Sequence, residues 1–168
     1  MNKIAYAALL FIASIHSAIA SDMYIGLKLG NTKHDISVSG YTETASSAGL
    51  FAGYSMSPNL AIEAETTNLG SISSGAAKIS ALSLSAVGTH NFDEQVSLFG
   101  KLGVASTREE VSTVVANKAG LTFGFGGQYN VNKTIGLRLG WDRYTYGGEK
   151  GLYEGTASMT SLAVLIRF

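Results

Sequence analysis

Apolar and polar residues alternate with a period of two along most of the chain after residue 22. This is the period of a β-strand whose two faces meet different surroundings. Between Tyr24 and Asn31, for example, Ile25, Leu27 and Leu29 are apolar and the intervening residues are small or charged. The alternating segments lie at 24–31, 49–54, 60–65, 82–85, 97–104, 120–126, 135–142 and 161–168, of which 49–54 is the weakest.

Long and tight connections between these segments follow one another in turn. The tight ones lie at 55–59, 91–95 and 130–133, and the long ones at 33–47, 67–78, 106–118 and 145–155. The residues from 21 onward that lie outside these connections give roughly ten per strand, close to the ~9–11 with which a tilted strand crosses a bilayer. An even number of strands places both chain ends on the side of the tight turns. We therefore predict an all-β fold, an eight-stranded antiparallel transmembrane β-barrel with up-and-down topology.

A soluble barrel that carries a ligand in an apolar cavity would also alternate, but with its aliphatic side chains inside. The charges favour the membrane instead, because nearly all strand charges share a face with glycine and serine. In a narrow closed barrel this face is the lumen, where charges pair, and lipid takes the aliphatic face. Glu63 is expected to pair with Arg138 or Lys101, while Phe51, Phe99 and Leu165 help to occlude the lumen. The predicted lumen charge network is Lys28, Glu63, Glu65, Lys101, Arg138, Asp142 and Arg167.

Aromatic residues are expected to form one ring at each membrane interface, which also favours the membrane barrel. The ring at the side of the tight turns would contain Tyr24, Tyr54, Phe92, Tyr129 and Phe168. The opposite ring would contain Tyr41, Trp141, Tyr144, Tyr146 and Tyr153.

The N-terminus has the pattern of an export signal. Lys3 provides a positive charge, residues 4–15 form a largely apolar stretch, and Ala18-Ile19-Ala20 supplies the small residues of a cleavage site. The stretch is shorter than the about 20 residues of a spanning helix, which disfavours the alternative of an uncleaved anchor. We expect cleavage between Ala20 and Ser21, so that 1–20 is a signal peptide and 21–168 is the outer-membrane β-barrel domain.

Composition and the positions of histidine exclude several function classes. Twelve basic residues balance twelve acidic ones, which argues against a nucleic-acid partner. The chain has no cysteine, so a disulfide scaffold, thiolate-bound zinc and a cysteine nucleophile are excluded. His34 and His90 are expected at opposite rims, where they cannot share a metal or join one Ser–His–acid group. We expect no enzymatic activity, cofactor or metal; a lipid A-modifying enzyme and a narrow channel are the alternatives.

Two stretches carry a resemblance to a known family. The chain ends Leu-Ala-Val-Leu-Ile-Arg-Phe, and Leu137–Tyr144 reads Leu-Arg-Leu-Gly-Trp-Asp-Arg-Tyr. With the export signal and eight alternating segments, the chain resembles the outer membrane protein A-like and opacity-protein family of Gram-negative bacteria. The resemblance implies interior charges at Glu63 and Lys101. The chain departs from the family pattern in one respect: it is expected to be the barrel alone, without a peptidoglycan-binding domain. The resemblance also implies a C-terminal signal for the barrel assembly machinery at Leu162, Val164, Ile166 and Phe168.

The expected function is a structural and surface-interaction role: envelope integrity, adhesion or immune evasion through long extracellular loops. The expected location is the cell outer membrane of a Gram-negative bacterium, with both termini in the periplasm. We expect a monomer whose partners are outer-membrane lipids, lipopolysaccharide, the barrel assembly machinery and a host-surface ligand. The cations expected near lipopolysaccharide phosphates are Lys33, Lys78, Arg108, Lys118 and Arg143.

Overall fold

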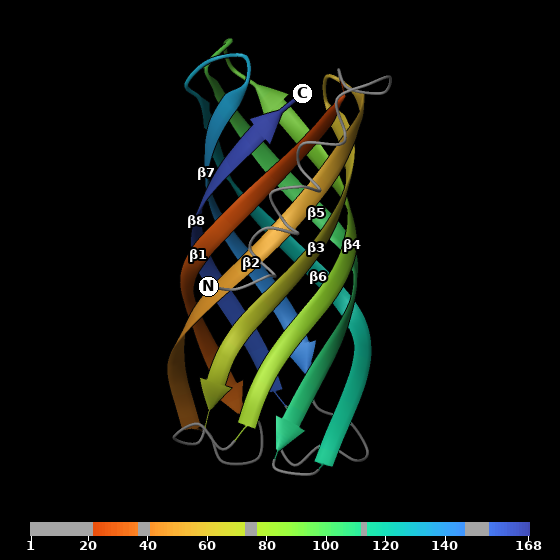
Figure 1. Cartoon of the computed structure of the whole chain (residues 1–168), viewed down its shortest axis with the longest axis vertical. Coiled ribbons are helices and arrows are strands. Elements are labelled where there is room, and N and C mark those ends of the chain that lie inside the picture. The colour runs from red at the N-terminus through yellow and green to blue at the C-terminus, as the bar shows by residue number, and fades with distance from the viewer. Residues whose placement is uncertain (1–21, 37–40, 73–76, 112–113, 147–154) are drawn as a thin grey trace, which may run out of the picture.

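Eight strands close into one barrel in a computed structural model that describes residues 22–36, 41–72, 77–111, 114–146 and 155–168 (Figure 1). Each strand pairs antiparallel with the next, and β8 pairs with β1, which confirms the predicted fold and topology. The predicted cleavage site, Ala20 and Ser21, lies outside the described residues. The strands are β1 Met23–Ile36, β2 Tyr41–Ser57, β3 Leu60–Ile72, β4 Ala77–Asn91, β5 Val96–Val111, β6 Val114–Asn130, β7 Ile135–Tyr146 and β8 Gly155–Arg167.

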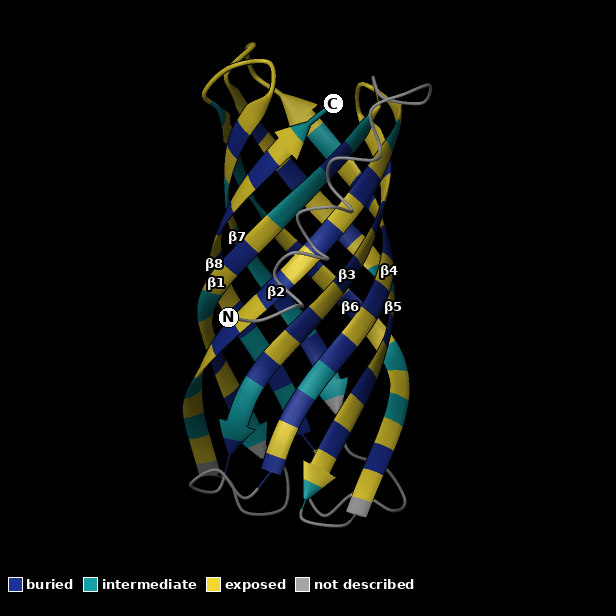
Figure 2. Ribbon diagram, in the orientation of Figure 1, coloured by how far each residue is buried: buried dark blue, intermediate teal, exposed yellow. Residues whose placement is uncertain are grey.

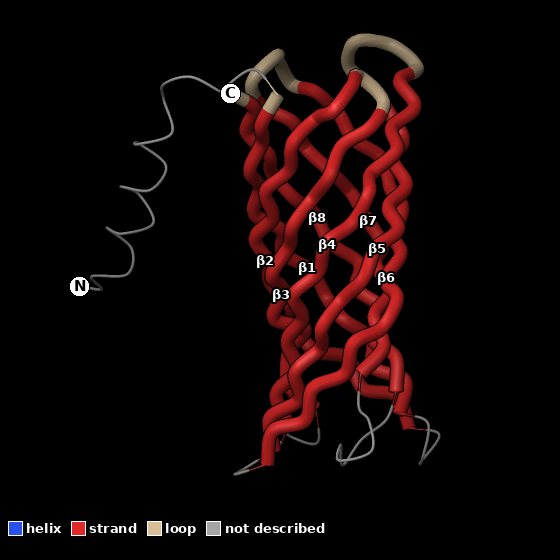
Figure 3. Tube along the Cα trace, turned by 90° about the vertical axis from the view of Figure 1, so that its right-hand side faces the viewer, coloured by secondary structure: helices blue, strands red, loops and turns tan. Residues whose placement is uncertain are grey.

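Tight turns gather at one end of the barrel, called the turn end here. They span 58–59, 92–95 and 131–134 and lie with the C-terminus at the top of Figure 1, as the rotated view in Figure 3 also shows. Short polar side chains hold two of these turns. Asp93 Oδ1 accepts the N–H of Val96 at 2.6 Å, and Asn132 Oδ1 accepts that of Ile135 at 2.7 Å. The opposite end, from which the strands continue into the undescribed segments, is called the loop end.

The strands run further toward the loop end than the sequence analysis predicted. Within the expected loop 33–47, Lys33 of β1 pairs with Thr44 of β2. Within the expected loop 106–118, the β5–β6 hairpin continues to the pair Val111 and Val114. The predicted extents of the loops, 33–47, 67–78, 106–118 and 145–155, are therefore wrong, because each contains residues of the flanking strands.

The outer face of the barrel changes its chemistry partway along the strands. In a lipid-facing band on the turn side, large apolar side chains point outward, and Leu82, Leu102 and Leu162 are 63%, 63% and 60% exposed. Toward the loop end, outward positions hold polar residues instead, and we call this part of the wall the outer extension. Its outward residues include Asn31, Lys33, Thr44, Ser46, Asn68, Lys78, Ser106, Arg108, Glu110, Asn117, Thr156 and Ser158.

The alternation of buried and exposed residues continues through both parts of the wall (Figure 2). What changes is the chemistry of each side. An aliphatic outer surface fits lipid, whereas a polar outer surface fits water. The barrel therefore has the surface of a membrane-embedded wall in the band and that of a soluble wall in the outer extension. Among the described residues, no helix is long and apolar enough to span a membrane.

Close strand packing gives a matched pair of glycine substitutions. A Cβ on Gly30 of β1 would lie 2.0 Å from the carbonyl oxygen of Thr160 on β8, whereas a Cβ on Gly100 would have nothing within 4 Å. Gly30→Ala should lower the free energy of unfolding by about 1–3 kcal/mol, the usual cost of overpacking. Gly100→Ala should leave it unchanged or slightly raised. Denaturant unfolding in phospholipid vesicles measures both, and equal effects would show that the Gly30 contact is wrong.

Candidate functional site

Six buried charged side chains meet in the middle of the lumen, and we call this group the ionic cluster. They come from four alternate strands, β1, β3, β5 and β7, and point inward because each has the buried parity of its strand. Three cations face three carboxylates, so the formal charges within the group cancel. Its members are Lys28, Glu63, Glu65, Lys101, Arg138 and Asp142.

Both lysines of the ionic cluster bridge the same two carboxylates. Lys28 Nζ lies 2.5 Å from Glu65 Oε1 and 2.9 Å from Asp142 Oδ2. Lys101 Nζ lies 2.8 Å from Glu65 Oε2 and 2.9 Å from Asp142 Oδ1. The hydroxyls of Thr67 and Tyr144 also donate to Glu65. These partners replace the water that each buried charge loses on folding.

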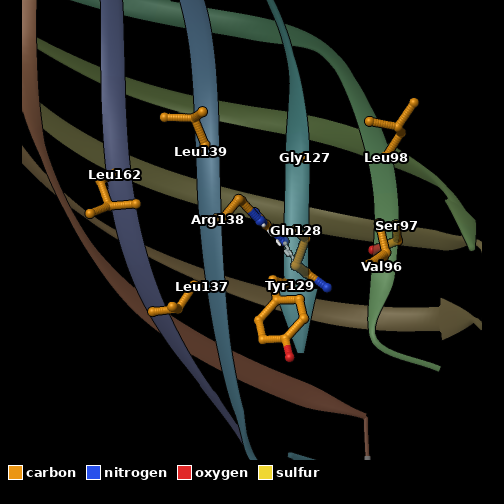
Figure 4. Close-up of a pocket in the computed structure, with 10 residues that line it drawn as sticks. All are labelled: Val96, Ser97, Leu98, Gly127, Gln128, Tyr129, Leu137, Arg138, Leu139 and Leu162. Carbon is orange, nitrogen blue, oxygen red and sulfur yellow. Dashed lines mark hydrogen bonds between the residues drawn. The ribbon is translucent and has the colours of Figure 1, made fainter. Parts of the chain in front are cut away.

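Arg138 forms the turn-side part of the ionic cluster. Its Nη1 lies 2.7 Å from Glu63 Oε2, and Lys101 Nζ lies 3.7 Å from Glu63 Oε1, so Glu63 contacts both cations expected for it. The guanidinium carbon is 4.6 Å from the ring centroid of Phe99 and 5.2 Å from that of Phe51. Arg138 also donates to Gln128 Oε1 from Nε and Nη2, at 3.2 and 3.1 Å (Figure 4).

Apolar layers lie on both sides of the ionic cluster. On the turn side, the layer consists of Tyr24, Phe51, Ala61, Val87, Phe99, Ala163 and Leu165. On the loop side, within the outer extension, it consists of Leu69, Ile72, Ala77, Ile79, Ala81, Ala105, Tyr144, Ala157 and Met159. The cavity between the ionic cluster and the phenylalanine rings has a volume of about 20 Å³, enough for about one water molecule.

A β-bulge in β3 helps to build the loop-side layer. The register shifts between Asn68 and Gly70, where Gly70 adopts a φ of 93° that favours glycine. Asn68 Oδ1 accepts the Gly70 N–H at 2.9 Å. Because the extra residue reverses the alternation, Leu69 and Ile72 both point into the lumen, and both are fully buried.

Several aromatic residues lie elsewhere than predicted. Tyr24 and Tyr144 were assigned to the interfacial rings, but both are buried in the lumen, where their hydroxyls donate to Glu63 and Glu65. Their parity is that of Lys28 and Asp142 on the same strands, which explains the correction. Outward aromatic residues do occur at Tyr54, Phe92 and Tyr129 on the turn side and at Trp141. Phe168 is partly exposed at the turn end, whereas the side chains of Tyr41, Tyr146 and Tyr153 lie outside the described residues.

Arg167 is separate from the ionic cluster, although it was predicted to join it. It lies in the lumen at the turn end, where its Nη2 donates to Asn130 Oδ1 at 2.7 Å. The residues of the predicted assembly signal alternate on the outer surface of β8, where Leu162, Val164 and Ile166 are exposed. Leu98, Leu139 and Leu162 line an outward hollow of about 340 Å³ over Gly127 (Figure 4).

The two histidines after residue 22 lie at opposite ends of the barrel. His90 is exposed at the end of β4, near the turn end. His34 was expected at a rim, within the long loop 33–47, but it is buried inside the outer extension, where its Nε2 lies 2.9 Å from the carbonyl oxygen of Leu69. The structure brings the two histidines into no common site. Within the described parts of the chain, no group of three or more His, Asp or Glu residues could hold a metal ion.

Burial of His34 predicts a pH-dependent stability. It lies outside the lipid-facing band, and its burial lowers the pKa of the imidazole below the ordinary 6.5 despite its hydrogen bond to Leu69 and the nearby Glu43 and Asp35. The imidazole therefore contributes stability that is fully present above about pH 6.5 and is lost as the pH falls below it. The thermal unfolding midpoint should fall between pH 7.5 and 5.5, and less in His34→Gln, which does not titrate. Equal decreases would contradict this assignment.

The cations predicted near the outer rim divide into three groups. Lys33 lies 3.6 Å from Asp35 and Arg108 lies 2.8 Å from Glu110, so both have acidic neighbours. Lys118 has the inward parity of β6 and is partly exposed. Lys78 and Arg143 point outward in the outer extension and form no ion pair within the described residues. Arg143 instead donates to the hydroxyl of Thr156 at 3.1 Å.

A family model described as "Outer membrane protein beta-barrel domain" matches residues 4–168. Neisserial surface protein A is similar in structure, with a TM-score of 0.69, 18% sequence identity, and coverage of 89% of this chain and 99% of that one. The Yersinia pestis attachment invasion locus protein Ail, in complex with the heparin analogue sucrose octasulfate, has a TM-score of 0.59, 16% identity and coverage of 88% and 99%. The N-terminal β-barrel domain of Pseudomonas aeruginosa OprF has a TM-score of 0.60, 15% identity, and coverage of 86% of this chain and 97% of that one. No curated protein matches the chain in sequence.

Proposed function

Because the chain belongs to the outer membrane protein β-barrel domain family, we propose that it is a non-enzymatic surface barrel with a closed lumen, whose outer extension makes the functional contacts. The observation that carries this proposal is the change of polarity along the wall. In the lipid-facing band, aliphatic side chains point outward and charges point inward. In the outer extension, polar side chains point outward and the interior holds an apolar layer beside a few buried polar side chains such as Thr32 and His34. The second part needs water around it, so it is suited to contacts outside the bilayer.

The stacked interior supports a closed lumen. The ionic cluster is neutral, its charges are paired across the barrel, and apolar layers cover it on both sides. An eight-stranded barrel has an interior that side chains can fill. An ion crossing this interior would have to displace several buried ion pairs and pass two apolar layers. These features favour a plug over the alternative of a narrow channel.

The arrangement of histidines supports a role without catalysis. A lipid A deacylase would need histidine, serine and an acid close together. His34 is buried beside Leu69, and His90 is at the other end of the barrel. The remaining roles are adhesion, immune evasion and envelope integrity. The names of the similar structures, a surface protein and an attachment invasion locus protein bound to a heparin analogue, favour adhesion among them.

The β5–β6 hairpin allows a direct test of the outer extension. Glu109 pairs with Ala116 and Arg108 with Asn117, so residues 109–116 can be replaced by an Asn-Gly turn without changing the register. In a deletion strain complemented with this variant, adhesion to host cells and to immobilised heparin should fall. Envelope integrity, measured by detergent sensitivity, should match the wild type. Full adhesion by the deletion strain that carries only the shortened variant of this protein would contradict the role of this hairpin.

Lipopolysaccharide is the proposed lipid partner of the outer surface. Arg143 lies two residues beyond Trp141 on the same face of β7, at the border between the lipid-facing band and the outer extension. A lipid phosphate there would meet a guanidinium that forms no ion pair with an acidic side chain of the described residues.

Arg143→Gln should therefore weaken the stabilisation that lipopolysaccharide gives the protein in detergent by about 1 kcal/mol for one lost cation. The rise in the thermal unfolding midpoint on adding lipopolysaccharide should be smaller by the corresponding amount. Lys133→Gln, in a turn at the opposite end, is the matched control and should keep the full rise. The same rise in all three proteins would contradict the contact.

A further inference from the structure

A second feature of the lumen lies at the turn end, between the turn-side apolar layer and the tight turns. It is a cavity of about 180 Å³ lined by residues of seven strands, with polar side chains that include Ser55, Thr89, Gln128 and Asn130. Two arginines, Arg138 and Arg167, line the same cavity, and none of the described residues that line it is acidic. The acidic residues nearest in sequence to these strand ends, Asp22, Asp93 and Glu94, are exposed.

The charge of this cavity comes from Arg167. Arg138 is neutralised by Glu63, its partner at 2.7 Å in the ionic cluster. Arg167 forms no ion pair with a carboxylate of the described residues, and its side-chain hydrogen-bond partner is the neutral amide oxygen of Asn130. A guanidinium has five N–H donors, so most of those on Arg167 are left for another acceptor.

An amide chain fixes the position of Arg167 relative to Arg138. Arg138 donates to Gln128 Oε1, Gln128 Nε2 donates to Asn130 Oδ1 at 3.1 Å, and Arg167 donates to the same Asn130 oxygen. Asn130 Nδ2 in turn donates to the carbonyl oxygen of Glu94 in the turn 92–95. The two guanidinium groups are therefore held on one wall, and the hydroxyls of Ser55 and Thr89 line the same space.

We propose that this cavity is a binding site for a small oxyanion, a phosphate or a carboxylate, with Arg167 as its charged ligand. The planar fork of a guanidinium matches both anions with two parallel hydrogen bonds. A bound oxyanion would supply the negative charge that the lumen residues around Arg167 do not. This site is distinct from the surface contacts proposed above and does not depend on them.

Titration of the purified barrel with inorganic phosphate tests the site. In a maltoside detergent, which contains no phosphate, and a low-chloride buffer, calorimetry should show saturable binding with one phosphate per barrel. Arg167→Gln should weaken it at least tenfold. Asn130→Asp should do the same while keeping Arg167, because the new carboxylate pairs with the guanidinium in place of phosphate. Lys133→Gln, an exposed cation on a turn at the same end, should bind like the wild type.

Two results would overturn the proposal: no saturable phosphate binding by the wild type, or wild-type affinity in both Arg167→Gln and Asn130→Asp. Asn130→Asp keeps the test valid if Arg167→Gln fails to fold. Refolding the purified protein avoids any effect of Arg167, which lies between Ile166 and Phe168, on cellular assembly. A repeat in phosphatidylglycerol nanodiscs identifies the source of the anion. Unchanged phosphate binding there assigns the site to soluble oxyanions, and competition by this lipid assigns it to a headgroup.

Discussion

Glu65→Gln is expected to lower the free energy of unfolding by about 3–5 kcal/mol, the usual cost of removing one partner of a buried ion pair. The substitution keeps the shape of the side chain but removes the charge that Lys28 and Lys101 share, at 2.5 and 2.8 Å. It leaves the ionic cluster with one excess positive charge between two apolar layers. Equilibrium unfolding by denaturant in phospholipid vesicles, followed by fluorescence of Trp141, the single tryptophan, measures the change.

Two further variants separate the buried cluster from ordinary surface charge. Glu110→Gln removes an exposed partner of Arg108 and should change the stability by less than about 1 kcal/mol. Glu65→Gln combined with Lys101→Met restores neutrality, so the double variant should lose less stability than the sum of the two single variants. If the single effects simply add, the cluster does not act as one paired unit.

Phe99→Ala is expected to have the second largest effect, a loss of about 3–5 kcal/mol in the free energy of unfolding. The Phe99 ring is buried in the turn-side layer and lies 4.6 Å from the guanidinium of Arg138. Its removal leaves a cavity beside a buried charge, and the backbone of a closed barrel cannot collapse to fill it.

Phe125→Ala is the matched control for Phe99→Ala. Phe125 is on the neighbouring strand β6 but points outward and is 60% exposed. Since lipid can fill the space that its ring leaves, its loss should cost much less stability than that of Phe99. The same unfolding experiment compares the two variants, and similar losses would mean that Phe99 does not pack as part of the lumen.

Much of the fold could be predicted from alternation because the two faces of each strand meet different media. Lys28, Glu63 and Lys101 point inward as expected, since their parity is that of the glycines and serines around them. The same rule predicts the interior positions of Tyr24 and Tyr144. The prediction failed for these two because their aromatic character was given more weight than their parity. A tyrosine hydroxyl that can donate to a buried carboxylate is suited to either place.

The outer extension was missed for a different physical reason. Alternation continues through Ala77-Lys78-Ile79-Ser80-Ala81, but the apolar residues there point inward, whereas Leu82 and Leu84 point outward. The adjacent pair Ala81-Leu82 marks the reversal. If every apolar residue is assigned to the lipid-facing side, the pattern fits the lipid-facing band but not the outer extension. The polar outward residues of the outer extension were therefore interpreted as loops. The separation of Arg167 from the ionic cluster depends on cross-barrel distances, which one sequence does not contain.

We propose that the ionic cluster and its two apolar layers close the lumen. Conductance of the purified, folded wild-type protein in a planar lipid bilayer is the direct test of this closure. A diffusion porin added afterwards to the same membrane shows that the bilayer can report a pore. No steady channels are expected before that addition. Long-lived channels of constant conductance from the wild-type protein alone would contradict it.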